Sequence, residues 1–127
     1  MASEAIPPSV QQFIWRHIPS VGQLEILCVL WQDSRRKWSV QDLRKELQSS
    51  EEAIKSCLQR FSQAGLLTAD EQERYAYAPT NPQLEETVNA VVKIYRERRV
   101  TVIELIYQRP SDSIQGFADA FRFKQEN

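Results

Sequence analysis

The chain has 127 residues, the size of one ordinary domain with extensions, and 42% of them are hydrophobic, enough to bury a core of normal size. Three glycines are too few for the many turns of a β-sandwich, so the composition favours a mainly α fold. The formal net charge of -1 lacks the basic excess of many nucleic-acid domains, and any phosphate binding would have to rely on a local basic patch.

The first 19 residues predict an extended arm and one short helix. Pro7 and Pro8 keep the start of the chain extended, and residues 9–17 carry apolar side chains on one face at helical spacing. Pro19 ends this helix. His17 is the only histidine of the chain, and because no nucleophile motif or second ligand accompanies it, we expect a packed or capping role.

Two further helices are predicted before residue 48. The side chain of Ser20 can cap the first of them, with Gln23 at the reciprocal position of a capping box. Apolar residues occupy most faces of this helix, which predicts a central, buried element. Ser39 can cap the second, shorter helix. Cys28 and Cys57 both fall in apolar helical runs, so we expect two buried thiols rather than a disulfide or a metal pair.

A helix over residues 50–64 and a hairpin follow. Ser49 and Glu52 have the spacing of a second capping box, and Gly65 stands where a left-handed residue often ends a helix. After Gly65 the period changes, and two short alternating runs joined by a polar turn predict a β-hairpin.

The second predicted strand carries Tyr75 and Tyr77 on the same face. We expect that face to pack onto the core, and base stacking is the alternative.

The C-terminal region predicts a long helix and a shorter one. Asn81 and Pro82 start the long helix, which continues to about Gln108 with an apolar seam that only Arg98 interrupts. A last helix would carry an apolar face made of Ile114, Phe117, Ala118 and Phe121. Because the remaining core is small, we expect these faces to form a homodimer. In the alternative, both helices fold back on their own domain.

The order of elements is that of a winged helix-turn-helix domain: helix, short strand-like entry, helix, tight turn, helix, glycine and β-hairpin. Residues 50–67, SEEAIKSCLQRFSQAGLL, resemble the recognition helix and first wing strand of MarR-type and penicillinase-repressor-type bacterial regulators. Residues 24–31, LEILCVLW, resemble the first helix of the second group. The resemblance covers about half of the chain.

The expected architecture is therefore mainly α, a winged helix-turn-helix with a small β-hairpin wing and a C-terminal helical extension. We divide the chain into an N-terminal arm and short helix at 1–19, the winged helix-turn-helix domain at 20–79, and a probable dimerisation region at 80–127.

The resemblance implies a dimeric regulator that binds duplex DNA through the third helix of the motif. The base-reading face carried over from the family is Glu52, Ser56, Gln59 and Gln63, with Lys55 and Arg60 at its edges. The basic triplet Arg35, Arg36 and Lys37 either grips the phosphate backbone or is a solvated loop.

Three groups of charges bear on this interpretation. Glu51 and Glu52 place carboxylates at the entrance of the recognition helix, where they also suit the positive end of the helix dipole. The predicted wing turn, residues 70–74, is acidic where a DNA-contacting wing would carry Lys or Arg. Arg96, Arg98 and Arg99 either contact nucleic acid or an acidic partner, or pair within their helix with Glu97 and neighbouring acids.

No motif in the sequence predicts catalysis. There is no phosphate-cradling glycine loop, no metal-ligand cluster and no nucleophile motif, so we expect neither an enzyme nor a cofactor or metal. No signal peptide or membrane span is recognised, and the cytoplasm is the expected compartment. The alternative function is a winged-helix adaptor that binds protein and has no DNA affinity, which the acidic wing and the neutral net charge favour.

Overall fold

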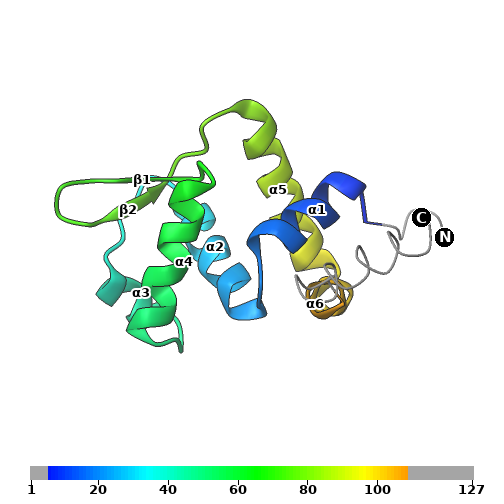
Figure 1. The fold of residues 1–127 in the computed structure, drawn as a ribbon, viewed down its shortest axis with the longest axis horizontal. Coiled ribbons are helices and arrows are strands. Elements are labelled where there is room, and N and C mark those ends of the chain that lie inside the picture. Colours follow the sequence, from blue (N-terminus) through cyan, green and yellow to red (C-terminus); the bar gives the residue numbers. More distant parts are fainter. Residues whose placement is uncertain (1–5, 109–127) are drawn as a thin grey trace, which may run out of the picture.

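The computed structural model describes residues 6–108, and within them the chain is mainly helical with one small antiparallel sheet (Figure 1). The expected last helix with Phe117 and Phe121 lies outside the described residues. The elements in chain order are α1 (Pro8–His17), α2 (Val21–Gln32), α3 (Val40–Glu46), α4 (Glu51–Gln63), β1 (Leu67–Ala69), β2 (Tyr75–Tyr77), α5 (Pro82–Glu97) and α6 (Arg99–Tyr107).

Serine caps begin α2 and α3, as the sequence predicts. The Ser20 hydroxyl accepts a hydrogen bond from the Gln23 amide at 3.3 Å, but Gln23 Oε1 is buried without a partner, so the expected reciprocal bond is not formed. At α3 a complete capping box is present. The Asp42 amide donates to the Ser39 hydroxyl at 3.0 Å, and the Ser39 amide donates to the Asp42 carboxylate at 3.1 Å.

The predicted capping box at the start of α4 is wrong. Ser50, in an extended conformation, is the N-cap, and its hydroxyl accepts from the Ala53 amide at 3.1 Å. The helix therefore begins one residue later than a box of Ser49 and Glu52 requires. The position that would return the reciprocal bond is an alanine, which has no acceptor.

Gly65 ends α4 in the left-handed conformation that the sequence predicts, with φ of +83°. Its carbonyl accepts from the Thr80 amide at 2.9 Å, and a Cβ at this position would lie 2.8 Å from Thr80 Oγ1. Glycine therefore meets two needs here, a positive φ and the close approach of the segment that leads to α5.

The sheet consists of β1 and β2, and Trp38 extends it by one residue. Leu67 lies opposite Tyr77 and Ala69 opposite Tyr75. Trp38 pairs with Tyr75 through two backbone hydrogen bonds of 2.7 Å, so the connection between α2 and α3 runs beside β2. Tyr77 is buried and Tyr75 half-buried, which confirms that one face of the hairpin packs onto the core.

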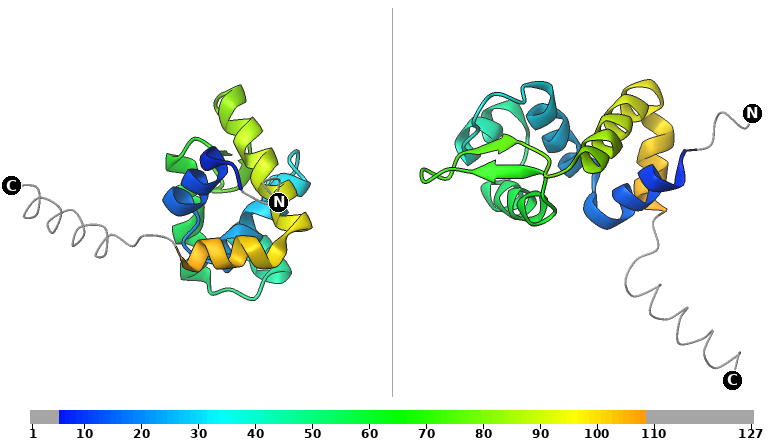
Figure 2. Two further views of the ribbon diagram at one scale, coloured as in Figure 1. Left: turned by 90° about the vertical axis from the view of Figure 1, so that its right-hand side faces the viewer. Right: turned by 90° about the horizontal axis from the view of Figure 1, so that it is seen from above.

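The predicted long helix after Pro82 is wrong, because it breaks at Arg98. The backbone of Arg98 has φ of -136° and ψ of 58°, and α6 then turns toward α1 (Figure 2). The Trp15 indole donates to the carbonyl of Leu105 at 3.0 Å and ties α1 to α6. Neither glycine nor proline marks the break, so tertiary packing rather than local propensity places it there.

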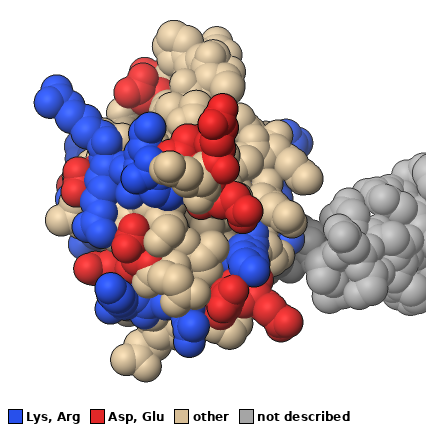
Figure 3. Space-filling model, turned by 90° about the vertical axis from the view of Figure 1, so that its left-hand side faces the viewer, with Lys and Arg blue, Asp and Glu red and all other residues tan. Residues whose placement is uncertain are grey.

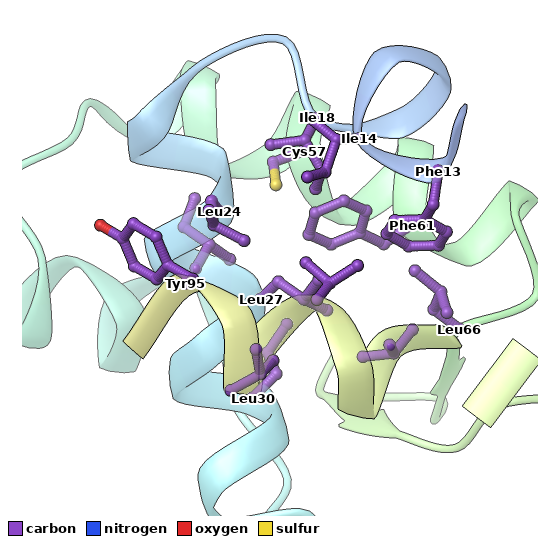
Figure 4. Packing of buried hydrophobic residues seen from close by; sticks show 14 of the residues in the cluster. Phe13, Ile14, Ile18, Leu24, Leu27, Leu30, Cys57, Phe61, Leu66 and Tyr95 are labelled. Carbon is purple, nitrogen blue, oxygen red and sulfur yellow. The ribbon is translucent and has the colours of Figure 1, made fainter. Parts of the chain in front are cut away.

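One hydrophobic core joins all the helices described. Side chains of α1, α2, α4 and α5 meet in its centre (Figure 4). Four of the six predicted seam residues, Val88, Val91, Tyr95 and Val102, have 4% exposure or less, and the other two, Leu84 and Leu105, are half-buried against the same core. Within residues 6–108, the C-terminal helices therefore fold back on their own chain, while the hairpin projects from the opposite end of the molecule.

Candidate nucleic-acid interface

The exposed face of α4 is the polar one that the sequence predicts. Ile54, Cys57, Leu58 and Phe61 are completely buried, because their helical spacing places them on the side that meets the core. The opposite side exposes the predicted contact residues, which are Glu52, Lys55, Ser56, Gln59, Arg60 and Gln63. This face can offer amide and hydroxyl groups to an external partner.

The short helix α3 braces α4 at its N-terminal end. The two helices contact each other, and Leu43 is fully buried beneath them. Glu51 on α4 accepts from Gln41 Nε2 at 3.4 Å and lies 3.8 Å from the Arg44 guanidinium. The two helices and the turn between them therefore present the polar face of α4 in a fixed orientation.

Lys55 forms an exposed ion pair within its own helix. Its ammonium lies 3.1 Å from the Glu51 carboxylate, one helical turn earlier. The hydrogen bond and charge of Lys55 lower the pKa of Glu51, and Glu51 raises the pKa of Lys55. Glu73 of the hairpin turn also raises the Lys55 pKa, which places that acidic turn on the Lys55 side of α4.

Two of the three predicted basic loop residues are held by the protein. The Arg36 guanidinium lies 3.7 Å from the centre of the Trp38 ring and 4.0 Å from the Asp42 carboxylate. Lys37 Nζ lies 3.7 Å from Asp70. Arg35 is exposed and pairs with no carboxylate of residues 6–108, so it alone of the triplet offers an uncompensated charge.

Asp70 organises the hairpin turn. Its carboxylate accepts from the backbone amides of Gln72 and Arg74, each at 2.9 Å, and from Arg74 Nε at 3.0 Å. These bonds, that from the Arg74 amide first, lower the pKa of Asp70. Glu71 and Glu73 are exposed beside it, and Glu73 has φ of +60°.

The hairpin end of the molecule is consequently close to neutral. Basic and acidic side chains are interspersed on its surface (Figure 3). Residues 33–74 contain eight basic and eight acidic side chains, so no excess of positive charge gathers there. The exposed face of α4 therefore has the expected polar groups, but the residues around it at the hairpin end have no excess of positive charge.

A second basic edge, which the sequence analysis did not include, lies where α1 ends beside α4. Arg16 and Arg60 are exposed, and no carboxylate of the described chain lies within ion-pair distance of either. His17 follows Arg16 and packs on Phe13, with the two ring centres 4.9 Å apart. Burial, and then the charges of Arg16 and Arg60, lower the His17 pKa. Helical spacing places Arg60 on this edge, but only the tertiary fold brings Arg16 there.

The arginines near the end of α5 contact aromatic side chains and α2. Arg99 lies 3.4 Å from the Glu25 carboxylate and 5.0 Å from the centre of the Tyr95 ring. Arg96 lies 5.1 Å from the centre of the Trp31 ring. The expected pairing with Glu97 is thus replaced, for these two, by interactions that join the end of α5 and the start of α6 to α2.

Both cysteines are free thiols packed in the helical core. Burial raises the pKa of Cys28 to about 11 and that of Cys57 to about 12, so both remain protonated and unreactive at neutral pH. Within residues 6–108, no cluster of three or more His, Cys, Asp or Glu side chains could hold a metal ion. In the same residues no helix has the length and apolar character needed to cross a bilayer.

No protein-family model matches the chain, and comparisons with curated proteins and with solved structures also find no match.

Proposed function

We propose that residues 20–79 are a winged helix-turn-helix domain that binds duplex DNA, and that the protein is a cytoplasmic transcriptional regulator. One observation carries the proposal: α3 braces α4 so that its polar face is exposed, while the hairpin and Trp38 form a small sheet beside it. A helix presented in this way fits the major groove of B-DNA. The resemblance of residues 50–67 to MarR-type and penicillinase-repressor-type regulators supports the same function.

The exposed side chains of α4 have chemistry suited to reading bases. The amides of Gln59 and Gln63 can donate to and accept from adenine in the major groove, and the Ser56 hydroxyl can bond to any base edge. Lys55, Arg60 and the loop residue Arg35 are placed to meet phosphates. Because Glu51 partly neutralises Lys55, its contribution should be smaller than that of a free lysine.

The test is selection of bound sequences from a random duplex pool at low salt. Gln59→Ala should change the preferred sequence, because it removes a base contact, whereas Lys55→Gln should weaken binding to all sequences alike. Gln32→Ala, at an exposed glutamine at the end of α2, is the matched control and should change neither. Absence of duplex binding by the folded wild-type protein at low salt would contradict the proposal.

The second candidate function is a winged-helix adaptor that binds protein. The ion pairs of Lys55, Lys37 and Arg74 with acidic neighbours favour it, because they engage three of the cations on the hairpin side of α4. Retention on heparin separates the two candidates. A DNA-binding protein should be retained and elute with a clear dependence on salt, and an adaptor should flow through.

A further inference from the structure

The two edges of α4 differ in whether their cations are free. On the edge toward α3 and the hairpin, Lys55 and Arg44 share Glu51, and Lys37 and Arg74 share Asp70. On the edge toward α1, no carboxylate of residues 6–108 pairs with Arg16 or Arg60. The α1 edge therefore offers two cations beside α4 that no carboxylate of residues 6–108 engages, whereas on the other side Arg35 and Lys45 are the exposed cations without such a contact.

The packing of the core determines which residues form this α1 edge, defined by Arg16, His17 and Arg60. Cys57 lies beside Ile14 of α1 and Ile18, which follows that helix, and all three side chains are buried (Figure 4). The end of α1 is thus fixed beside the middle of α4. Arg60 follows Cys57 by almost one helical turn and lies at the solvent border of this contact.

His17 is the third residue of this edge and lies near enough to both arginines for their charges to act on it. Its ring packs on Phe13, and burial together with the neighbouring guanidinium groups lowers its pKa. A phosphate placed at this edge would meet two exposed guanidinium groups that no carboxylate of residues 6–108 engages.

We propose that Arg16 and Arg60 bind the sugar-phosphate backbone on the α1 side of α4, so that the protein holds one of the two strands that border the groove. This inference rests on the proposed DNA-binding function. The major groove is about 12 Å wide, and a helix lying in it has a phosphate backbone along each edge. The backbone on the other edge faces Glu71 and Glu73, whose exposed carboxylates repel it.

The experiment measures the affinity of the full chain for a short random-sequence duplex as a function of salt concentration. Each phosphate contact contributes about 0.9 to the slope of log affinity against log salt. Arg16→Gln and Arg60→Gln should each reduce that slope by about 1 and weaken binding at low salt.

Two variants serve as controls. Lys93→Gln removes one exposed cation from α5 that has no carboxylate partner among the described residues, and it should leave the slope unchanged. Lys37→Gln removes a cation on the hairpin side that lies 3.7 Å from Asp70, and it should lower the slope less than Arg16→Gln does. Far-ultraviolet circular dichroism establishes that each variant remains folded.

The outcomes separate this inference from the function on which it rests. If the wild type binds duplex DNA and the slope is insensitive to both Arg16→Gln and Arg60→Gln, the α1 edge is not the phosphate contact while DNA binding stands. A slope that falls with Lys37→Gln but not with Arg16→Gln would also overturn the proposed asymmetry. If the folded wild type does not bind duplex DNA, both proposals are wrong.

Discussion

At the scale of single residues, the fold decides which charges remain free. The pair of Glu51 and Lys55 is separated by one helical turn, so its spacing alone could have predicted it. The pairs of Lys37 with Asp70 and of Arg99 with Glu25 join residues far apart in the chain, and no sequence pattern marks them. For this reason the polar face of α4 was predictable from the sequence, but the pairing of the nearby cations with carboxylates on the hairpin side was not.

His17 gives a prediction at this scale. Its pKa in the folded protein is lowered, by burial first and then by Arg16 and Arg60. His17 therefore binds a proton more readily in the unfolded chain than in the folded protein. The free energy of unfolding is not reduced by this above the unfolded pKa of about 6.5, and it falls as the pH drops below that value. Between about pH 7.5 and pH 5.5, wild-type protein should lose more stability than His17→Gln, measured by denaturant midpoints.

Carboxylates do not interfere with this comparison. Asp42, Glu51 and Asp70 all have lowered pKa values, so they titrate at lower pH, and they are present in both proteins. Parallel loss of stability in the two proteins would show that His17 is not held neutral by the fold.

At the scale of elements, local signals predicted the starts and ends of helices better than their continuation. Serine caps, the glycine after α4 and the change of period at the hairpin all correspond to observed features. The break at Arg98 has no such signal, because it depends on α1 offering Trp15 and a buried surface to α6. A seam that reads as one long helix is in fact divided between two helices of the same core.

The prediction at the scale of secondary-structure elements concerns the stability effect of replacing Gly65. Gly65→Ala should destabilise the protein by roughly 1–2 kcal/mol from the left-handed backbone alone. The added Cβ would also press on Thr80 Oγ1, 2.8 Å away, which adds to the loss. Gly22→Ala is the matched control, since its Cβ would meet only Ser20 Oγ at 3.8 Å, and it should be neutral or stabilising by up to about 1 kcal/mol. Equal denaturation midpoints for the two variants would contradict this role for Gly65.

At the scale of the whole molecule, the described chain buries most of the apolar seam that the sequence analysis assigned to a homodimer contact. The seam of α5 and α6 is covered by α1, α2 and α4 rather than left for a second copy. Val100 and Tyr107 are the large hydrophobic side chains of residues 6–108 that remain exposed, at 67% and 64%. They are seven residues apart on α6, so they share one face of that helix.

The exposed face of α6 and the sequence that follows this helix are the basis for predicting a homodimer. The sequence after α6 contains two further aromatic residues, Phe117 and Phe121, which lie outside the described residues. A two-fold dimer would cover such surfaces and present two α4 helices to paired half-sites on DNA. We therefore expect the full chain to sediment as a dimer. Val100→Glu combined with Tyr107→Glu should shift it to a monomer, because two carboxylates would be buried in the contact.

Gln83→Glu adds a carboxylate to an exposed position of α5 and serves as the control, which should remain dimeric. The double substitution changes only exposed side chains of α6, so its unfolding midpoint should stay near that of the wild-type monomer extrapolated to low concentration. A wild-type chain that sediments as a monomer at high micromolar concentration would contradict the dimer. A double variant that remains dimeric would instead place the contact away from this face of α6.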